Sequence, residues 1–108
     1  MKIKKRKELE KKGFHIGSAS EFLNLSPEEE AYIEIRLDMS ELVKDRRIKK
    51  GWTQEELAKT IGSSQSRVAK LESGDSGISL DLMIKSLLSL GVSKEDIGEK
   101  LKGTLKPV

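Results

Sequence analysis

The feature that most constrains the fold is a repeated pattern of helix start and stop signals from residue 26 onward. Apolar residues recur there with helical spacing, and each such segment begins at a hydroxyl residue: Ser26, Thr53, Ser64, Ser79 and Ser93. The oxygen of such a side chain accepts a hydrogen bond from a free N–H in the first turn of a helix. Glycine, which readily takes the left-handed conformation that ends helices, closes the first four segments at Gly51, Gly62, Gly74 and Gly91. The pattern predicts an all-α domain of five helices.

The first predicted helix has the strongest start signal. Ser26 is followed by Pro27, whose fixed φ suits the first helical position, and by Glu29, which completes a capping box. An apolar stripe then continues toward Gly51 through Tyr32, Ile35, Met39, Leu42, Val43 and Ile48. The spacing fits either one helix of more than five turns or two helices that break near residues 38–40. The last predicted helix, which begins at Ser93, is weakened by Gly98 in its interior.

Composition restricts the classes of function. The 108 residues include no cysteine and a single histidine, His15, so thiolate metal sites are excluded and no catalytic triad is indicated. The chain starts with basic residues, but no apolar signal-peptide core follows, and no window approaches a membrane span. We therefore expect a cytoplasmic protein without cofactor or metal that is not an enzyme. Its expected parts are a basic tail and N-terminal extension (1–25), a helical domain (26–102) and a C-terminal tail (103–108).

The net charge of +3 conceals a segregation of charge along the chain. Residues 1–12 hold seven Lys or Arg against two Glu, and residues 44–72 hold eight against four acids. Residues 13–43 hold one Arg against seven acids. Such segregation suggests a surface that faces a polyanion beside an acidic surface, although ordinary solvated charge explains the composition equally well.

Residues 53–74, TQEELAKTIGSSQSRVAKLESG, predict two short helices joined by a turn at Gly62. This is the arrangement of a helix-turn-helix, in which the first helix bridges the DNA backbone and the second lies in the major groove. The second helix begins with the short polar run SSQSR, which suits side chains that reach base edges. The residues expected to hold the two helices together are Leu57, Ala58, Ile61, Val68 and Leu71.

The same stretch resembles the helix-turn-helix of the phage repressor/Cro superfamily, also called the XRE family. The resemblance covers roughly residues 39–101, and it implies a five-helix, lambda-repressor-like domain that binds double-stranded DNA. In that family the residue that matches Gln54 contacts phosphate. The residues that match base-reading positions are Gln65, Ser66 and Lys70, with Ser64 and Arg67 beside them at the groove edge. Arg47 and Glu72 match a pair that forms a structural salt bridge in the family.

Some of these positions have alternative roles. Ser64 could serve only as a helix cap, and Arg67 could be a phosphate clamp or a solvated charge. Trp52 is expected to be a partly buried plug under the turn rather than a base-stacking platform. Asp75 departs from the pattern of many relatives, which carry basic residues in the loop after the second helix. Because Asp75 would repel a phosphate, binding is expected to rely on a dimer, on the basic tail or on a partner.

One helix-turn-helix of this size contacts few base pairs, and members of the resembled family bind palindromic operators as twofold dimers. The resemblance therefore implies a homodimer that acts as a transcriptional repressor. Its dimer surface is expected on helix 80–90 and on the last helix, with Ile97 and Leu101. The alternative is that these helices only complete the core, which would account for Ile84, Leu87 and Leu88.

The segment before the family-like region, residues 13–37, resembles that of HigA-type antitoxins, which neutralise a RelE/HigB-like ribonuclease toxin and repress their own operon. Toxins that cut RNA are basic, so an acidic segment that carries apolar residues could dock onto one. The candidate partner-binding residues are Phe14, Ile16, Phe22 and Leu25, which could instead fold back on the domain as a brace. The alternative functions are a stand-alone repressor without a toxin, and an interaction module that no longer binds DNA or a small enzyme. The absence of a catalytic constellation argues against the enzyme.

Overall fold

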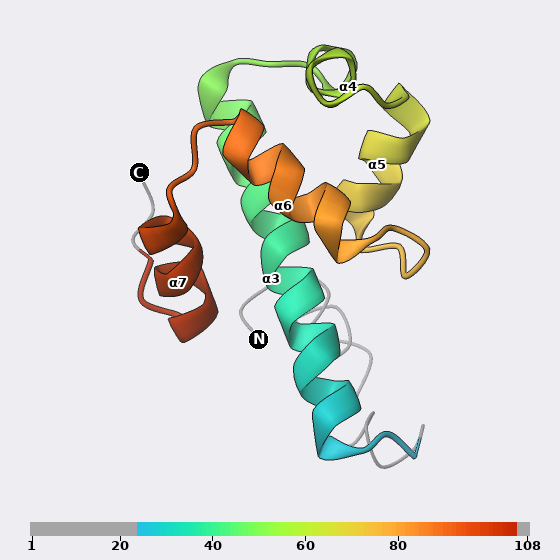
Figure 1. Cartoon of the computed structure of the whole chain (residues 1–108), viewed down its shortest axis with the longest axis vertical. Coiled ribbons are helices and arrows are strands. Elements are labelled where there is room, and N and C mark those ends of the chain that lie inside the picture. The colour runs from blue at the N-terminus through green and yellow to red at the C-terminus, as the bar shows by residue number, and fades with distance from the viewer. Residues whose placement is uncertain (1–23, 106–108) are drawn as a thin grey trace, which may run out of the picture.

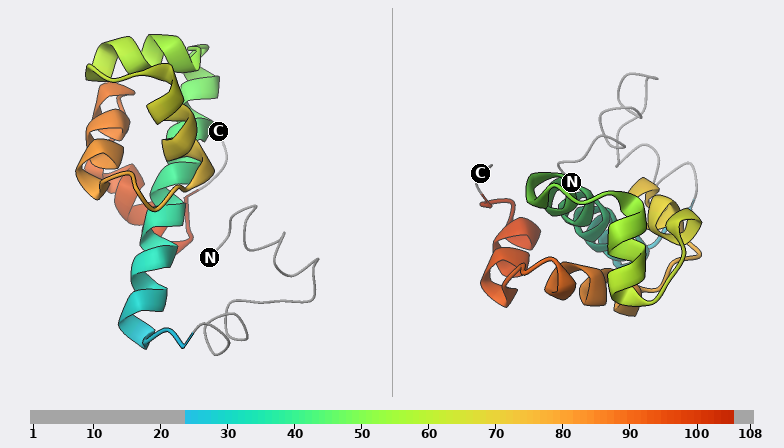
Figure 2. Two further views of the ribbon diagram at one scale, coloured as in Figure 1. Left: turned by 90° about the vertical axis from the view of Figure 1, so that its right-hand side faces the viewer. Right: turned by 90° about the horizontal axis from the view of Figure 1, so that it is seen from above.

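The computed structural model describes residues 24–105. Five α-helices follow one another: α3 (Pro27–Lys50), α4 (Gln54–Ile61), α5 (Gln65–Ser73), α6 (Leu80–Ser89) and α7 (Lys94–Lys102). No strand occurs within the described range. The long helix α3 runs through the molecule, with α4 lying across one of its ends (Figure 1). The shorter helices surround its second half (Figure 2). The predicted all-α architecture is confirmed.

Helix α3 is one continuous helix of 24 residues, so the alternative with a break near residues 38–40 is wrong. At its start Ser26 Oγ accepts a hydrogen bond from Glu29 N at 3.1 Å, and the Glu29 carboxylate accepts one from Ser26 N at 3.0 Å. These bonds to the backbone and side chain of Ser26 lower the pKa of the Glu29 carboxyl group. At the other end Gly51 adopts φ 79, which favours glycine, and stops the helix.

The remaining helices begin at the predicted caps. Thr53 and Glu56 form a second capping box at α4, and Ser64, Ser79 and Ser93 each accept a hydrogen bond from the N–H three residues ahead. Helix α6 ends at Ser89 with Leu90 as its cap, and Gly91 follows in the left-handed region. Helix α7 runs through Gly98 without interruption.

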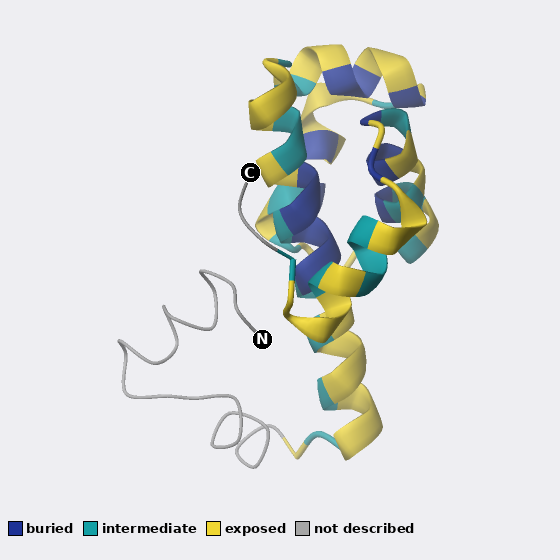
Figure 3. Ribbon diagram, turned by 90° about the vertical axis from the view of Figure 1, so that its left-hand side faces the viewer, coloured by how far each residue is buried: buried dark blue, intermediate teal, exposed yellow. Residues whose placement is uncertain are grey.

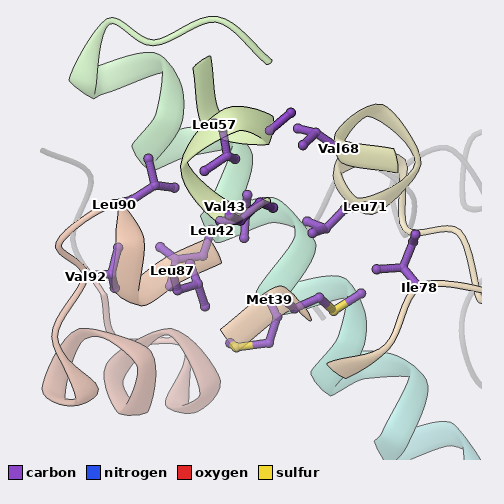
Figure 4. Packing of buried hydrophobic residues seen from close by; sticks show 13 residues of the cluster. Met39, Leu42, Val43, Leu57, Val68, Leu71, Ile78, Leu87, Leu90 and Val92 are labelled. Atoms are coloured by element: carbon purple, nitrogen blue, oxygen red, sulfur yellow. The ribbon is translucent and has the colours of Figure 1, made fainter. Parts of the chain in front are cut away.

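The core lies between the second half of α3 and helices α4, α5 and α6 (Figure 4). Burying one Leu-sized side chain contributes about 1.5–3 kcal/mol, so this cluster fixes the angles between the helices. Its buried members are Met39, Leu42, Val43, Leu57, Ala58, Ile61, Val68, Leu71, Ile78, Met83, Leu87, Leu90 and Val92. All five residues expected to hold the helix-turn-helix together are among them, which confirms that part of the prediction.

The first half of α3 projects beyond this core (Figure 3). Tyr32 is 50% exposed, Ile33 38% and Ile35 39%. The predicted apolar stripe is therefore buried from Met39 to Val43, whereas Tyr32, Ile35 and the distant Ile48 are exposed. Helical spacing identifies an apolar face of a helix, but it does not give the length over which other elements cover that face.

The two C-terminal helices differ in how they meet the core. On α6, Leu87 is fully buried and Ile84 packs at the edge of the core, but Leu88 is 57% exposed. The alternative that the core accounts for these three residues is thus correct for Leu87 and wrong for Leu88. On α7 no residue is buried, although Ile97 packs against the core and Leu101 is exposed.

Charged groups join α7 to α3. The Lys100 ammonium pairs with the Glu41 carboxylate, and Arg46 Nη1 lies 3.8 Å from Asp96 Oδ2. Asp38 of α3 is buried, and its Oδ1 has no hydrogen-bond partner within the described part of the chain. Burial raises the pKa of the Asp38 carboxyl group, and the positive charge of Lys100 opposes this shift. The seam between the two helices therefore contains a carboxyl group that is poorly compensated when charged.

Candidate nucleic-acid interface

Helices α4 and α5 form the predicted helix-turn-helix. The chain turns at Gly62, which adopts φ 67, and Ser64 then caps α5 by accepting a bond from Arg67 N at 3.2 Å. The apolar sides of both helices face the core, where Leu57, Ala58, Ile61, Val68 and Leu71 are buried. The turn and the shared core together fix how α5 lies against α4.

A nearly buried ion pair joins α3 to the end of α5. Arg47 Nε and Nη2 donate to the two carboxylate oxygens of Glu72 at 2.6 and 3.0 Å. A third bond runs from Arg47 Nη1 to the Trp52 carbonyl oxygen at 2.8 Å. The Arg47 and Glu72 side chains are 11% and 3% exposed, so these bonds form in a largely water-free site. The salt bridge expected between these two residues is confirmed.

Glu72 also begins a hydrogen-bond chain that leads to the start of α5. Gln54 Nε2 donates to Glu72 Oε1 at 3.1 Å, and Gln54 Oε1 accepts from Gln65 Nε2 at 2.6 Å. The Gln54 amide is therefore engaged at both ends, while the carbonyl oxygen and one N–H of Gln65 are left for other partners. Sequence reasoning missed this pairing, because the angle between α4 and α5 brings the two glutamines together.

The side of α5 that faces away from the core is polar and open. Ser66, Arg67 and Lys70 are exposed, as is Gln65 at the start of the helix. Ser64 caps the helix and is itself exposed, and its Oγ lies 3.3 Å from Ser66 Oγ. Among residues 24–105 no ion pair engages Arg67 or Lys70. The structure thus brings the site residues predicted on α5 together on one accessible surface.

Trp52 lies in the connection between α3 and α4. Its side chain is partly buried and packs against the core, while Lys50 Nζ lies over the ring, 5.0 Å from its centre. A cation above an aromatic face is attracted by the ring electrons. The residue is therefore a partly buried plug, as predicted.

The loop after α5 gives Asp75 a structural contact. Its Oδ1 accepts a hydrogen bond from Gly77 N at 2.7 Å, which stabilises the turn in the way typical of aspartate. The residue remains exposed, so its negative charge faces solvent beside the end of α5. A phosphate placed at this loop would be repelled.

The predicted partner-binding residues are covered only in part. Leu25 is partly buried just before Ser26, whereas Phe14, Ile16 and Phe22 lie outside the described residues. The described range contains no cluster of three or more His, Asp or Glu side chains that could hold a metal ion. None of the described helices is long and apolar enough to cross a membrane.

Comparison with known families agrees with this geometry. A family model described as a helix-turn-helix, HTH_3, matches residues 43–97. The match spans just over half of the 108 residues and includes α4, α5, α6 and the Arg47–Glu72 pair. No curated protein and no solved structure matches the chain. Because the family model covers over half of the chain, including the complete two-helix unit and most of the core that supports it, the chain belongs to the XRE-type helix-turn-helix family of DNA-binding transcriptional regulators.

Proposed function

We propose that this regulator is a sequence-specific repressor that reads operator bases with Gln65, Ser66 and Lys70. The observation that supports this most strongly is the division of α5 into two sides. Val68 and Leu71 anchor one side in the core, and the polar side chains of the other side are exposed. A helix presented in this way fits the major groove, which is about 12 Å wide.

The proposed base-reading residues have complementary chemistry. Gln65 carries a donor and an acceptor that can bond together to adenine, and Lys70 can donate to guanine O6 or N7. Ser66 lies one turn before Lys70 and shares its face of the helix. Three side chains with different donor and acceptor patterns therefore meet the groove from one short helix.

The neighbouring polar residues are proposed to contact the DNA backbone. Ser64 and Arg67 lie at the start of α5, where they can bond to phosphates and set the position of the helix without reading sequence. Gln54 keeps one N–H donor free after its bond to Glu72, which suits a phosphate oxygen. Because Gln54 also holds Gln65, it would connect a backbone contact to a base contact.

The repressor is further proposed to act as a twofold dimer on a palindromic operator. Leu88 is 57% exposed and borders a shallow depression on α6 that also includes Ile84 and Lys85. Leu101 of α7 is 44% exposed. Apolar side chains that the core leaves uncovered are suited to a symmetric contact with a second copy.

A second proposal is that the chain is the antitoxin of a RelE/HigB-like toxin. It is favoured by the projecting half of α3, where Tyr32, Ile33 and Ile35 are exposed next to three glutamates in the first turn. Apolar side chains of this kind supply the desolvated anchors of protein interfaces. The acids would speed the encounter with a basic ribonuclease. Without such a partner, the same domain would act as a stand-alone repressor.

DNA reading is tested by selecting binding sites from random duplexes with the full chain. We expect an inverted repeat whose half-site centres are about ten base pairs apart, or a multiple of that spacing. Binding should weaken steeply with salt, because each phosphate contact releases counterions. Gln65→Ala and Lys70→Ala should each cost about 1–3 kcal/mol and relax the preference at one position of each half-site.

Two further variants sharpen this test. Gln54→Ala should weaken binding to all duplexes and also relax the Gln65 position, because Gln65 loses its 2.6 Å bond. Lys94→Ala removes the same charge as Lys70→Ala from an exposed site on α7 and should leave the base preference unchanged. Recovery of no motif from the selection would refute the proposed function.

The antitoxin proposal is tested by co-expression with the product of the reading frame next to the gene. Ile33→Lys and Ile35→Lys should reduce capture of that product while operator binding persists. Ile48→Lys, a matched change at an exposed isoleucine near the other end of α3, should not affect capture. If no basic ribonuclease is encoded there, or if all three variants capture it equally, the partner-binding role of α3 is wrong.

A further inference from the structure

Arg36 is the one Lys or Arg between residues 13 and 43 of the sequence, and it is buried. Its guanidinium group reaches from α3 to the loop between α5 and α6, where it donates to the carbonyl oxygens of Asp75, at 3.0 Å, and Ile78. The Tyr32 hydroxyl accepts a bond from Arg36 Nη1 at 3.4 Å, and the centre of its ring lies 5.7 Å from the guanidinium carbon. Within the described part of the chain no carboxylate pairs with Arg36.

The loop held by Arg36 is bonded in turn to the last turn of α5. Asp75 N donates to the Lys70 carbonyl oxygen at 3.0 Å, and Ser73 Oγ donates to the same oxygen at 2.9 Å. Within the loop, Ile78 N donates to the Asp75 carbonyl oxygen at 3.2 Å. Arg36 is thus connected through a single loop residue to the backbone of Lys70, which we propose reaches a base.

This connection begins outside the matched family region, which starts at residue 43. It exists because α3 extends beyond that region and carries Arg36 against the loop. A buried charge is costly unless hydrogen bonds replace its lost water. Since the loop carbonyls supply most of those bonds, a displacement of the loop would leave buried donors unpaired, and the loop is therefore held firmly to α3.

We propose that Arg36 is a positioning residue for DNA reading, which sets where the last turn of α5, and with it Lys70, meets the bases. The proposal rests on the proposed role of α5 as the base-reading helix. Hydrogen bonds to base edges depend strongly on distance and angle, whereas phosphate contacts from long side chains adapt to a shifted backbone. Loss of Arg36 should therefore reduce discrimination between operator and random DNA more than it reduces binding to random DNA.

The test uses the full chain with Arg36→Met, which removes the charge and the donors, and Arg36→Lys, which keeps the charge but lacks the planar fork. The dissociation constants for the selected operator and for a random duplex are measured at one salt concentration, well below the melting temperature of each variant. For Arg36→Met we expect the ratio of the random-duplex constant to the operator constant to fall by about tenfold, as for one misplaced base contact. The fall should be smaller for Arg36→Lys, and the lost preference should map to the position assigned to Lys70.

Arg46→Met is the matched control, because Arg46 is 16% exposed and pairs with Asp45 and Asp96 instead of the loop. It should lower stability without changing the ratio. If Arg36→Met does not fold, Arg36→Lys and Tyr32→Phe, which removes only the 3.4 Å bond, provide the measurement. The role of Arg36 would be overturned if the wild type selects an operator but its Arg36 variants keep the same ratio, that is, lose equal affinity for both duplexes. A wild type that selects no operator would instead refute the proposed function on which this role rests.

Discussion

Breaking the Arg47–Glu72 ion pair should be among the most damaging single changes outside the apolar core. The two side chains are 11% and 3% exposed, and two bonds of 2.6 and 3.0 Å join them. Removing one partner of a buried pair leaves an uncompensated charge and costs about 3–5 kcal/mol. Glu72→Ala would leave the Arg47 guanidinium group with the Trp52 carbonyl as its one remaining partner among residues 24–105. Arg47→Met would leave the Glu72 carboxylate, in the described part of the chain, with the Gln54 amide as its one remaining partner.

The expected loss is large for a domain of this size. Domains are stable by about 5–15 kcal/mol, and in a small one each kcal/mol corresponds to about 4–8 °C of melting temperature. A loss of about 3 kcal/mol should therefore lower the melting temperature by about 12–24 °C. The measurement is thermal and urea unfolding followed by circular dichroism. Operator affinity should fall too, because Gln54 loses the Glu72 acceptor that helps to orient it.

A double-mutant cycle separates this reasoning from simple loss of packing. The cycle compares the single variants Arg47→Met and Glu72→Leu with the variant that carries both. The double variant leaves no buried charge, so it should be more stable than the sum of the two single losses predicts. The control is Lys49→Met, which removes the partly exposed pair with Asp45 and should cost less than about 1 kcal/mol. If each single variant loses less than about 1 kcal/mol of stability, or if the losses are strictly additive in the cycle, the pair does not act as a buried ion pair that stabilises the fold.

Two further outcomes are expected. Because burial raises the folded-state pKa of Asp38, its charged form destabilises the fold at neutral pH, and this penalty disappears as pH falls below the ordinary aspartate pKa of about 3.9. Asp38→Asn should therefore be more stable than the wild type at pH 7 and lose that advantage near pH 4, as measured by urea unfolding at each pH. A difference in unfolding free energy that does not change with pH would contradict this cause. If α6 forms the proposed dimer contact, Leu88→Glu should make the protein monomeric in light scattering and weaken its binding to the proposed inverted repeat, whereas the same change at the exposed Ile48 should do neither. A wild type and a Leu88→Glu variant that are both dimeric would exclude this face of α6.

The amino-acid sequence by itself determined where the helices begin and which sides of α4 and α5 are buried. Ser26 with Glu29 forms the predicted capping box, and Thr53 caps α4 as predicted and forms a second box with Glu56, because these bonds join groups only three residues apart. The burial of Val68 and Leu71 follows in the same way from the helical repeat. These features depend on short-range hydrogen bonds and periodicity, and both can be read along the chain.

Only the tertiary structure decided which side chains meet between helices and how far the core extends. The bond between Gln54 and Gln65 requires the particular angle of α4 against α5, and the contact of Arg36 with the loop at Asp75 spans 39 positions of sequence. The exposure of Leu88 beside the buried Leu87 depends on the faces of α6 that α3 and α4 cover. Contacts of this kind are set by how helices cross and by the volumes packed between them, and no local pattern in the sequence encodes these quantities.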